Sequence, residues 1–160
     1  MARVCVDACF LIGLYDKDDQ YHDIAVRQFG SLFGEESGRH QLVAPWPVLY
    51  ECLGTRYARN TATIPQKRTE FTRYWDYLSE GGQLVLLDDG PFREVPLSEH
   101  LAGPTRILSL VDRVLRAMIL DQGRLFDFFL TYNTGDFTDA CQASNIPLIN
   151  EKSLTNSYGF

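Results

Sequence analysis

Five short apolar runs alternate with longer stretches of helical character, and this alternation constrains the fold more than any other feature of the sequence. The runs cover residues 2–6, 41–44, 84–87, 126–132 and 147–149. Apolar runs of this length predict buried strands. Strands that alternate with helices predict a parallel sheet covered by helices on both faces. We therefore expect an α/β protein with three layers, α/β/α, and a central parallel sheet of four to five strands.

The segments between these runs are predicted to be mostly helical. Residues 88–104 are the exception, because they contain three prolines and two glycines and resist prediction. Residues 34–39 are predicted to be a loop, and residues 60–64 a break between two helices. We expect one domain over residues 1–150 and a partly ordered tail over 151–160. The predicted helices cover residues 8–14, 20–33, 47–57, 65–78, 107–120 and 136–144.

Composition excludes several classes of protein. The net charge of −6 argues against a protein that coats nucleic acids, which would be basic. No apolar run approaches the ~20 residues of a membrane span. A strand directly at the N-terminus argues against a signal peptide, so we expect a cytoplasmic protein. The four cysteines form no CxxC pair and have no histidine at zinc-finger spacing, so a cysteine metal site is not expected.

Two acidic residues follow predicted strands. Asp7 ends the first apolar run, and Asp136 lies in the polar segment after the fourth. The carboxyl ends of parallel strands form the edge where such sheets bind ligands. Each residue could instead cap a helix, Asp136 together with Asp139.

Two more acids lie within predicted helices. Asp112 follows Ser109 with the spacing of a capping box, which is its alternative explanation. Glu51 lies in an otherwise uncharged stretch and is expected to share a face with small residues, while Trp46, Tyr50 and Leu53 pack away from it. An unpaired carboxylate in such surroundings requires a cation. That cation would be a metal ion or an arginine.

Taken together, the four acids predict a metal site. Four clustered carboxylates repel one another unless divalent cations neutralise them. A site of carboxylate oxygens and water suits Mg²⁺ or Mn²⁺, in one or two ions. Such ions support the hydrolysis of phosphodiester bonds.

The ordered set of motifs resembles the PIN-domain nucleases, and among them the VapC-type toxins of bacterial toxin–antitoxin pairs. This resemblance implies a metal-dependent ribonuclease, an antitoxin partner and a possible homodimer. It also implies that Asp7, Glu51, Asp112 and Asp136 bind the metal, with Thr131, Asn133 and Ser109 in support. The motifs that carry the resemblance are VCVD followed by FLIGL, PVLYECL, SLVD and LTYNTGDF, and they span almost the whole chain.

The sequence departs from this family at three points. Ala8 stands where a hydroxyl residue often follows the first acid, and Arg113 stands where a small residue usually follows the third. The chain is also longer than many VapC toxins, and we place the extra length in residues 88–104.

A basic stretch follows Glu51. Its cations alternate with aromatic residues, and the two kinds of side chain could bind phosphates and stack on bases of single-stranded RNA. The alternative is a solvated helix face whose aromatic residues lie in the core. The cations are Arg56, Arg59, Lys67, Arg68 and Arg73, and the aromatic residues are Tyr57, Phe71, Tyr74 and Trp75.

Two other functions compete with the nuclease. A receiver-like phosphoacceptor would use Asp88 or Asp89 with Lys152, but it leaves Glu51 and Asp112 unexplained. A catalytically silent binding module of PIN fold is the second alternative. A phosphatase of the DxD type is excluded because Cys9 stands at the second acidic position.

Overall fold

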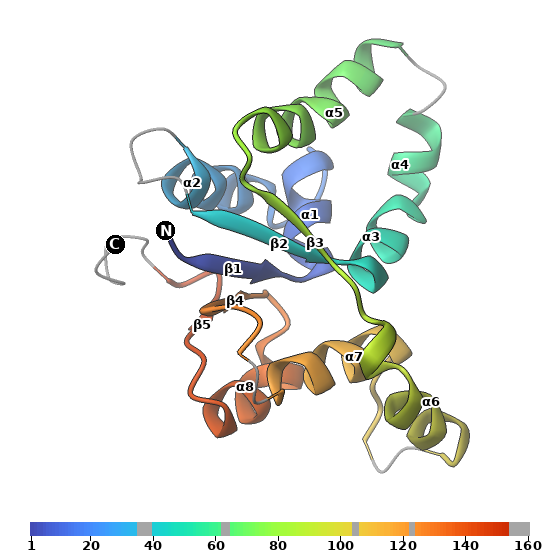
Figure 1. Ribbon diagram of the computed structural model, residues 1–160. Helices are drawn as coiled ribbons and strands as arrows, with labels where there is room; N and C mark the ends of the chain where they lie inside the picture. Colours follow the sequence, from blue (N-terminus) through green and yellow to red (C-terminus); the bar gives the residue numbers. More distant parts are fainter. Residues whose placement is uncertain (35–39, 62–64, 104–105, 122–123, 154–160) are drawn as a thin grey trace.

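A five-stranded, all-parallel sheet forms the centre of the protein, as the sequence predicts (Figure 1). The computed structural model describes residues 1–34, 40–61, 65–103, 106–121 and 124–153. The strand order is β3-β2-β1-β4-β5. The strands are β1 (Arg3–Val6), β2 (Gln41–Pro45), β3 (Leu84–Leu87), β4 (Phe128–Leu130) and β5 (Leu148–Ile149).

Helices cover both faces of this sheet. On one face lie α1 (Ala8–Tyr15), α2 (His22–Phe33) and α5 (Pro65–Glu80), and on the other lie α7 (Leu110–Ile119) and α8 (Thr134–Ala143) (Figure 1). Coverage from both sides explains why Val4, Cys5 and Val6 in the central strand are fully buried. The three-layer α/β/α prediction is therefore confirmed.

The predicted helix over 47–57 is in fact two helices, α3 (Trp46–Leu53) and α4 (Arg56–Thr61). Thr55 separates them, because its hydroxyl donates a hydrogen bond to the carbonyl of Cys52 and accepts one from the amide of Ala58. These two bonds end the first helix and cap the second.

Residues 88–104 contain more regular structure than the sequence suggests. A 3₁₀ turn, η2 (Gly90–Phe92), is followed by helix α6 (Glu94–Leu101), which packs against α7. Other boundaries shift by a few residues; β4, for example, is shorter than the apolar run that predicted it. Parts of the predicted loop, helix break and tail, namely residues 35–39, 62–64 and 154–160, lie outside the described residues.

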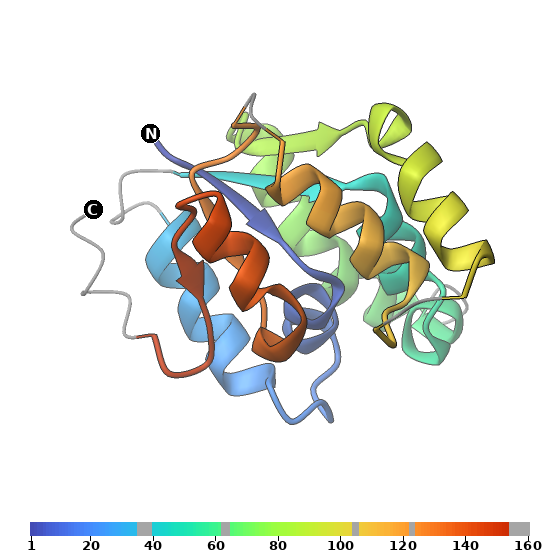
Figure 2. The same ribbon diagram turned by 90° about the horizontal axis from the view of Figure 1, so that it is seen from below.

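The strand order places a topological switch point between β1 and β4. The chain adds β2 and β3 on one side of β1, then returns to place β4 and β5 on the other. Ligands of open α/β sheets bind at such a point, outside the carboxyl ends of the strands. Figure 2 shows α7 and α8 packed side by side over this part of the sheet.

Across the described part of the chain, no helix is both long and apolar enough to span a membrane.

Candidate active site

Asp7 lies at the carboxyl end of β1 and is almost completely buried. Its carboxylate caps α1 by accepting a hydrogen bond from the amide of Ala8, and it accepts two more from the Thr131 hydroxyl (2.8 Å) and the Cys9 thiol (3.1 Å). Burial raises the pKa of Asp7; these hydrogen bonds offset part of the rise, and the charge of Asp112 adds to it. Asp7 therefore has the capping role and also lies at the switch point.

Glu51 projects from α3 with no ion pair or hydrogen bond to any described residue. Its side chain is exposed, but partial shielding from water raises its pKa, and the nearby charges of Asp7 and Asp112 raise it further. The alternative of an arginine salt bridge to Glu51 thus finds no support in the described residues. The prediction that the bulky residues of α3 pack on the face opposite Glu51 was wrong in part, because Trp46, Tyr50 and Leu53 are exposed.

Asp112 stands in the first turn of α7 and forms the predicted capping box with Ser109. The Ser109 hydroxyl accepts from the Asp112 amide at 3.0 Å, and the Asp112 carboxylate accepts from both the amide and the hydroxyl of Ser109. The box fixes the carboxylate at the end of α7, where its charge acts on Asp7 and Glu51.

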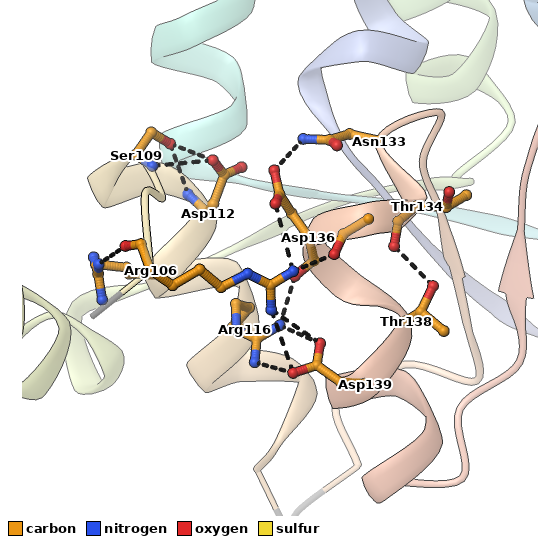
Figure 3. Close-up of polar contacts among 11 residues, drawn as sticks. Arg106, Ser109, Asp112, Arg116, Asn133, Thr134, Asp136, Thr138 and Asp139 are labelled. Atoms are coloured by element: carbon orange, nitrogen blue, oxygen red, sulfur yellow. Dashed lines mark hydrogen bonds and ion pairs between the residues drawn. The ribbon is translucent and has the colours of Figure 1, made fainter. Parts of the chain in front are cut away.

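Asp136 is held by different partners in the first turn of α8. It does not cap that helix, because the helix begins at Thr134 and Asn133 occupies the N-cap position. The Asn133 amide donates to the Asp136 carboxylate, and the Arg106 guanidinium lies 3.6 Å from it (Figure 3). Asp136 is thus partly neutralised by a cation that the sequence analysis did not consider.

Arg106 and Arg116 form a cationic cluster around α8 (Figure 3). Arg106 donates to the carbonyl of Gly135, and Arg116 makes a paired ion bridge to Asp139 at 2.6 and 2.8 Å. Hydrogen bonds from Arg116 hold the pKa of Asp139 well below its usual range. Asp139 therefore stabilises the packing of α7 on α8 and does not act as the capping partner of Asp136.

The structure does not bring all four predicted acids together. Asp7, Glu51 and Asp112 influence one another electrostatically, whereas Asp136 faces Arg106 and Asn133. In the described residues, no group of three or more acidic, histidine or cysteine side chains is close enough to hold a metal ion. The local bonds of Asp112 and Asp136 explain why the carboxylates do not converge on one point.

The donor set nevertheless has the chemistry that a hard divalent cation requires. Its members are carboxylates, and neither Asp7 nor Glu51 has a cationic partner within the described segments. Burial raises the pKa of Asp7 and Glu51, and the charges of the neighbouring acids raise both further, so a positive ion would lower the energy of the site. The residues therefore fit Mg²⁺ or Mn²⁺ in chemistry, although their carboxylates do not form a closed cage.

Two of the three departures from the family pattern, Ala8 and Arg113, have structural explanations. With alanine at position 8, the hydroxyl that contacts Asp7 comes from Thr131, directly after the neighbouring strand β4. Arg113 points away from the acids, because it donates to the carbonyl of Arg106 and lies 3.6 Å from Glu99. It thus anchors the segment that brings Arg106 to Asp136.

The basic stretch is solvent-exposed where the structure describes it. Arg56, Arg59, Arg68 and Arg73 are exposed, while the side chain of Lys67 lies outside the described residues. Tyr74 and Trp75 pack against the core, as the alternative explanation expected. These two aromatic residues are therefore not a stacking surface for bases.

The receiver-like alternative conflicts with the topology. Asp88 and Asp89 follow β3 and Lys152 follows β5, and these strands form opposite edges of the sheet. Four strand spacings, about 19 Å in total, separate the two strands. A phosphoryl group on either aspartate would be out of reach of Lys152.

A pocket of about 630 Å³ adjoins the acids and was not predicted from the sequence. It lies between α3, α6 and α7, and Glu51 and Ser109 form part of its wall. The part of the sequence that could have indicated this pocket is the stretch 88–104, which supplies Asp89, Arg93 and Leu97 to its wall.

Comparison with known proteins identifies the fold. Neither the protein-family models nor the curated proteins contain a match to this sequence. The structure matches that of VapC20 from Mycobacterium tuberculosis, a toxin that cleaves the sarcin-ricin loop, with a TM-score of 0.53 and 14% sequence identity. This match covers 85% of the present chain and 94% of that toxin.

A second match is to a chain of VapBC2 from Rickettsia felis, which was solved bound to a DNA fragment of its promoter. The TM-score is again 0.53, the identity is 13%, and the alignment covers 92% of this chain and 98% of the other. Both similarities extend over most of each chain. The protein therefore has the PIN-domain fold of the VapC toxins.

Proposed function

We propose that this protein is a Mg²⁺- or Mn²⁺-dependent endoribonuclease. One observation carries the proposal: Asp7, Glu51 and Asp112 repel one another at the switch point of a PIN fold, and Asp7 and Glu51 have no neutralising cation among the described residues. Ion-pair networks with a purely structural role also shift the pKa of acids, but such networks contain cations, and Asp7 and Glu51 have none among the described residues.

Asp7, Glu51 and Asp112 are the residues that would hold the metal, with Asp136 as a fourth ligand. A divalent cation at such a site supplies an activated water and stabilises negative charge on a phosphoryl oxygen. Thr131 and the Ala8 amide orient the carboxylate of Asp7, Ser109 orients Asp112, and Asn133 orients Asp136. Partial shielding from water and the charges of Asp7 and Asp112 raise the pKa of Glu51.

RNA is the substrate that we propose, and an antitoxin is the proposed partner. The toxin from M. tuberculosis is described as cleaving the sarcin-ricin loop, and the R. felis protein belongs to a VapBC pair. Arg56 and Arg59 are exposed on α4, directly after the helix that carries Glu51, and could contact RNA phosphates. A homodimer and a cytoplasmic location are further parts of this proposal.

Cleavage of single-stranded RNA with added Mg²⁺ or Mn²⁺ tests the proposed activity. We expect cleavage that EDTA abolishes and that the Asp112→Asn variant lacks. Asp76→Asn is the matched control, because Asp76 is exposed on α5, away from the acids, and this variant should cut normally. If several RNAs remain intact while metal binding is confirmed, the silent binding module becomes the better explanation.

The toxin role has a separate test. Expression of the protein alone should arrest cell growth, and co-expression of a neighbouring antitoxin gene should restore it. Unimpaired growth with catalytically active protein in the cells would contradict the toxin role and leave the nuclease activity intact.

A further inference from the structure

The pocket beside the acids has the volume and the mostly apolar lining of a ligand site. Its volume of about 630 Å³ falls within the range of ~300–1,000 Å³ that small-molecule sites occupy. Glu51 and Ser109 belong both to this pocket and to the candidate active site, so the two sites are continuous. Most of the remaining wall is apolar and consists of Pro47, Leu97, Leu110, Val111 and Val114.

An exposed aromatic residue stands at this pocket. Tyr50 lines it and is 66% exposed, an unusual state for a large aromatic side chain in a helix that packs on a core. Its ring lies 5.9 Å from that of Trp46, measured between centroids, so the two form an aromatic surface next to the pocket. Exposed aromatic rings of this kind stack on unpaired bases.

The pocket also contains one oriented cation. Asp89 is buried, and its carboxylate accepts from Nε and Nη2 of Arg93, both at 2.6 Å. This pairing occupies one side of the guanidinium. The other side, with both hydrogens of Nη1 and one of Nη2, has no hydrogen-bond partner among the described residues, and Arg93 itself lines the pocket.

Two adjacent N–H donors on a planar guanidinium match one base better than the others. Guanine presents two acceptors, O6 and N7, on a single edge, and arginine binds them as a pair. Adenine has a donor in place of O6 and cannot satisfy both N–H groups. Asp89 would act here as a positioning residue that aims Arg93.

We propose that this pocket binds an unpaired guanine base of the RNA substrate, stacked on Tyr50 and hydrogen-bonded by Arg93. The inference rests on the proposed ribonuclease function and deepens it, because it gives the site a base preference next to the scissile phosphate. A wholly apolar protein segment is a poorer occupant, since it would cover the free donors of Arg93 without supplying acceptors.

Equilibrium binding in EDTA tests the proposal without requiring cleavage. Fluorescence anisotropy would compare a short oligouridine that contains one guanine with the same strand containing adenine or 7-deazaguanine. We expect the guanine strand to bind about tenfold more tightly than the other two, as one bidentate pair allows. Equal binding of the three strands, or no binding at all, would overturn the proposal.

Two variants separate the roles of the residues. Arg93→Lys keeps a cation next to Asp89 but loses the paired donors, so it should abolish the guanine preference. Tyr50→Ala removes an exposed side chain without loss of core packing, and it should weaken all three strands several-fold. Arg27→Gln, which removes an exposed charge on α2, is the matched control and should bind like wild type.

Further outcomes distinguish the alternatives. If GMP binds as tightly as the guanine strand, the pocket is a site for free guanine nucleotides and the RNA proposal is wrong. If an apolar peptide displaces none of the RNA, a protein partner is not the occupant of the pocket and the proposal is supported. If the peptide binds and none of the RNA strands does, the proposal is overturned. A protein that prefers guanine yet never cleaves RNA would refute the proposed catalysis and retain the base pocket.

Discussion

Replacement of Glu51 by glutamine should have opposite effects on stability in the absence and presence of metal. Partial shielding from water raises the pKa of Glu51, and the charges of Asp7 and Asp112 raise it further. No hydrogen bond links its side chain to a described residue, so an amide at this position loses no partner. Without metal, the variant should therefore be more stable than wild type, because one of three repelling charges is gone.

The expected magnitudes follow from the exposure of the group. Charge pairs at exposed positions contribute about 0.2–1 kcal/mol, which corresponds to a Tm increase of up to about 4 °C for a chain of this size. Metal at about 100 times its Kd should stabilise wild type by about 2.7 kcal/mol, or about 5–10 °C. The variant should show a smaller metal-induced increase, because it lacks one ligand.

Thermal unfolding in EDTA and in excess Mg²⁺ or Mn²⁺ measures both effects. Glu151→Gln is the control, since Glu151 is exposed on the turn after β5 and does not affect the pKa of Asp7 or Glu51. The reasoning is refuted if Glu51→Gln melts below wild type in EDTA, or if its metal-induced increase equals that of wild type.

Four further predictions concern the acids and their surroundings. Thr131→Val should destabilise the fold by about 1–3 kcal/mol in chemical denaturation, because buried Asp7 loses a donor, and Thr131→Ser should restore most of the loss. Arg106→Gln should tighten Mn²⁺ binding by about two- to fivefold in calorimetry, since Arg106 competes for Asp136; weaker binding would contradict this. Mn²⁺ affinity should fall as the pH drops from neutral, because the raised pKa of Asp7 and Glu51 lets protons compete at higher pH than at ordinary carboxyls. For the same reason, the free energy of unfolding of the metal-free protein should fall as pH rises from the ordinary carboxyl range through the raised pKa of the two acids. A wild-type free energy of unfolding in EDTA that rises with pH relative to that of Glu51→Gln would contradict this.

The sheet and its topological class were predictable because their signals are local. Short continuous apolar runs such as 41–44 favour buried strands, and the acid after β1 was expected at the binding edge of a parallel sheet. The run 84–87 also forms a strand, but the prediction that it is buried was wrong, because β3 lies at the edge of the sheet and is only partly covered. The role of Asp112 in its capping box was also readable, since the Ser-x-x-Asp spacing is a contact within one helical turn.

Contacts between distant segments were not predictable. Arg106 reaches Asp136 across 30 positions, and Arg93 gains its orientation from a buried Asp89 in a stretch with no periodic pattern. Tyr50 was wrongly expected to be packed, because the helical pattern of α3 does not reveal that the neighbouring α6 and α7 leave a pocket beside it.

The central claim is that the acids at the switch point bind a divalent cation, and Mn²⁺ binding followed by electron paramagnetic resonance tests it most directly. Wild type should bind one or two ions per chain, with binding lost or strongly weakened in Asp7→Asn and unchanged in Asp76→Asn. Failure of wild type to bind Mn²⁺, or equal binding by Asp7→Asn, would contradict the claim that these carboxylates form a metal site.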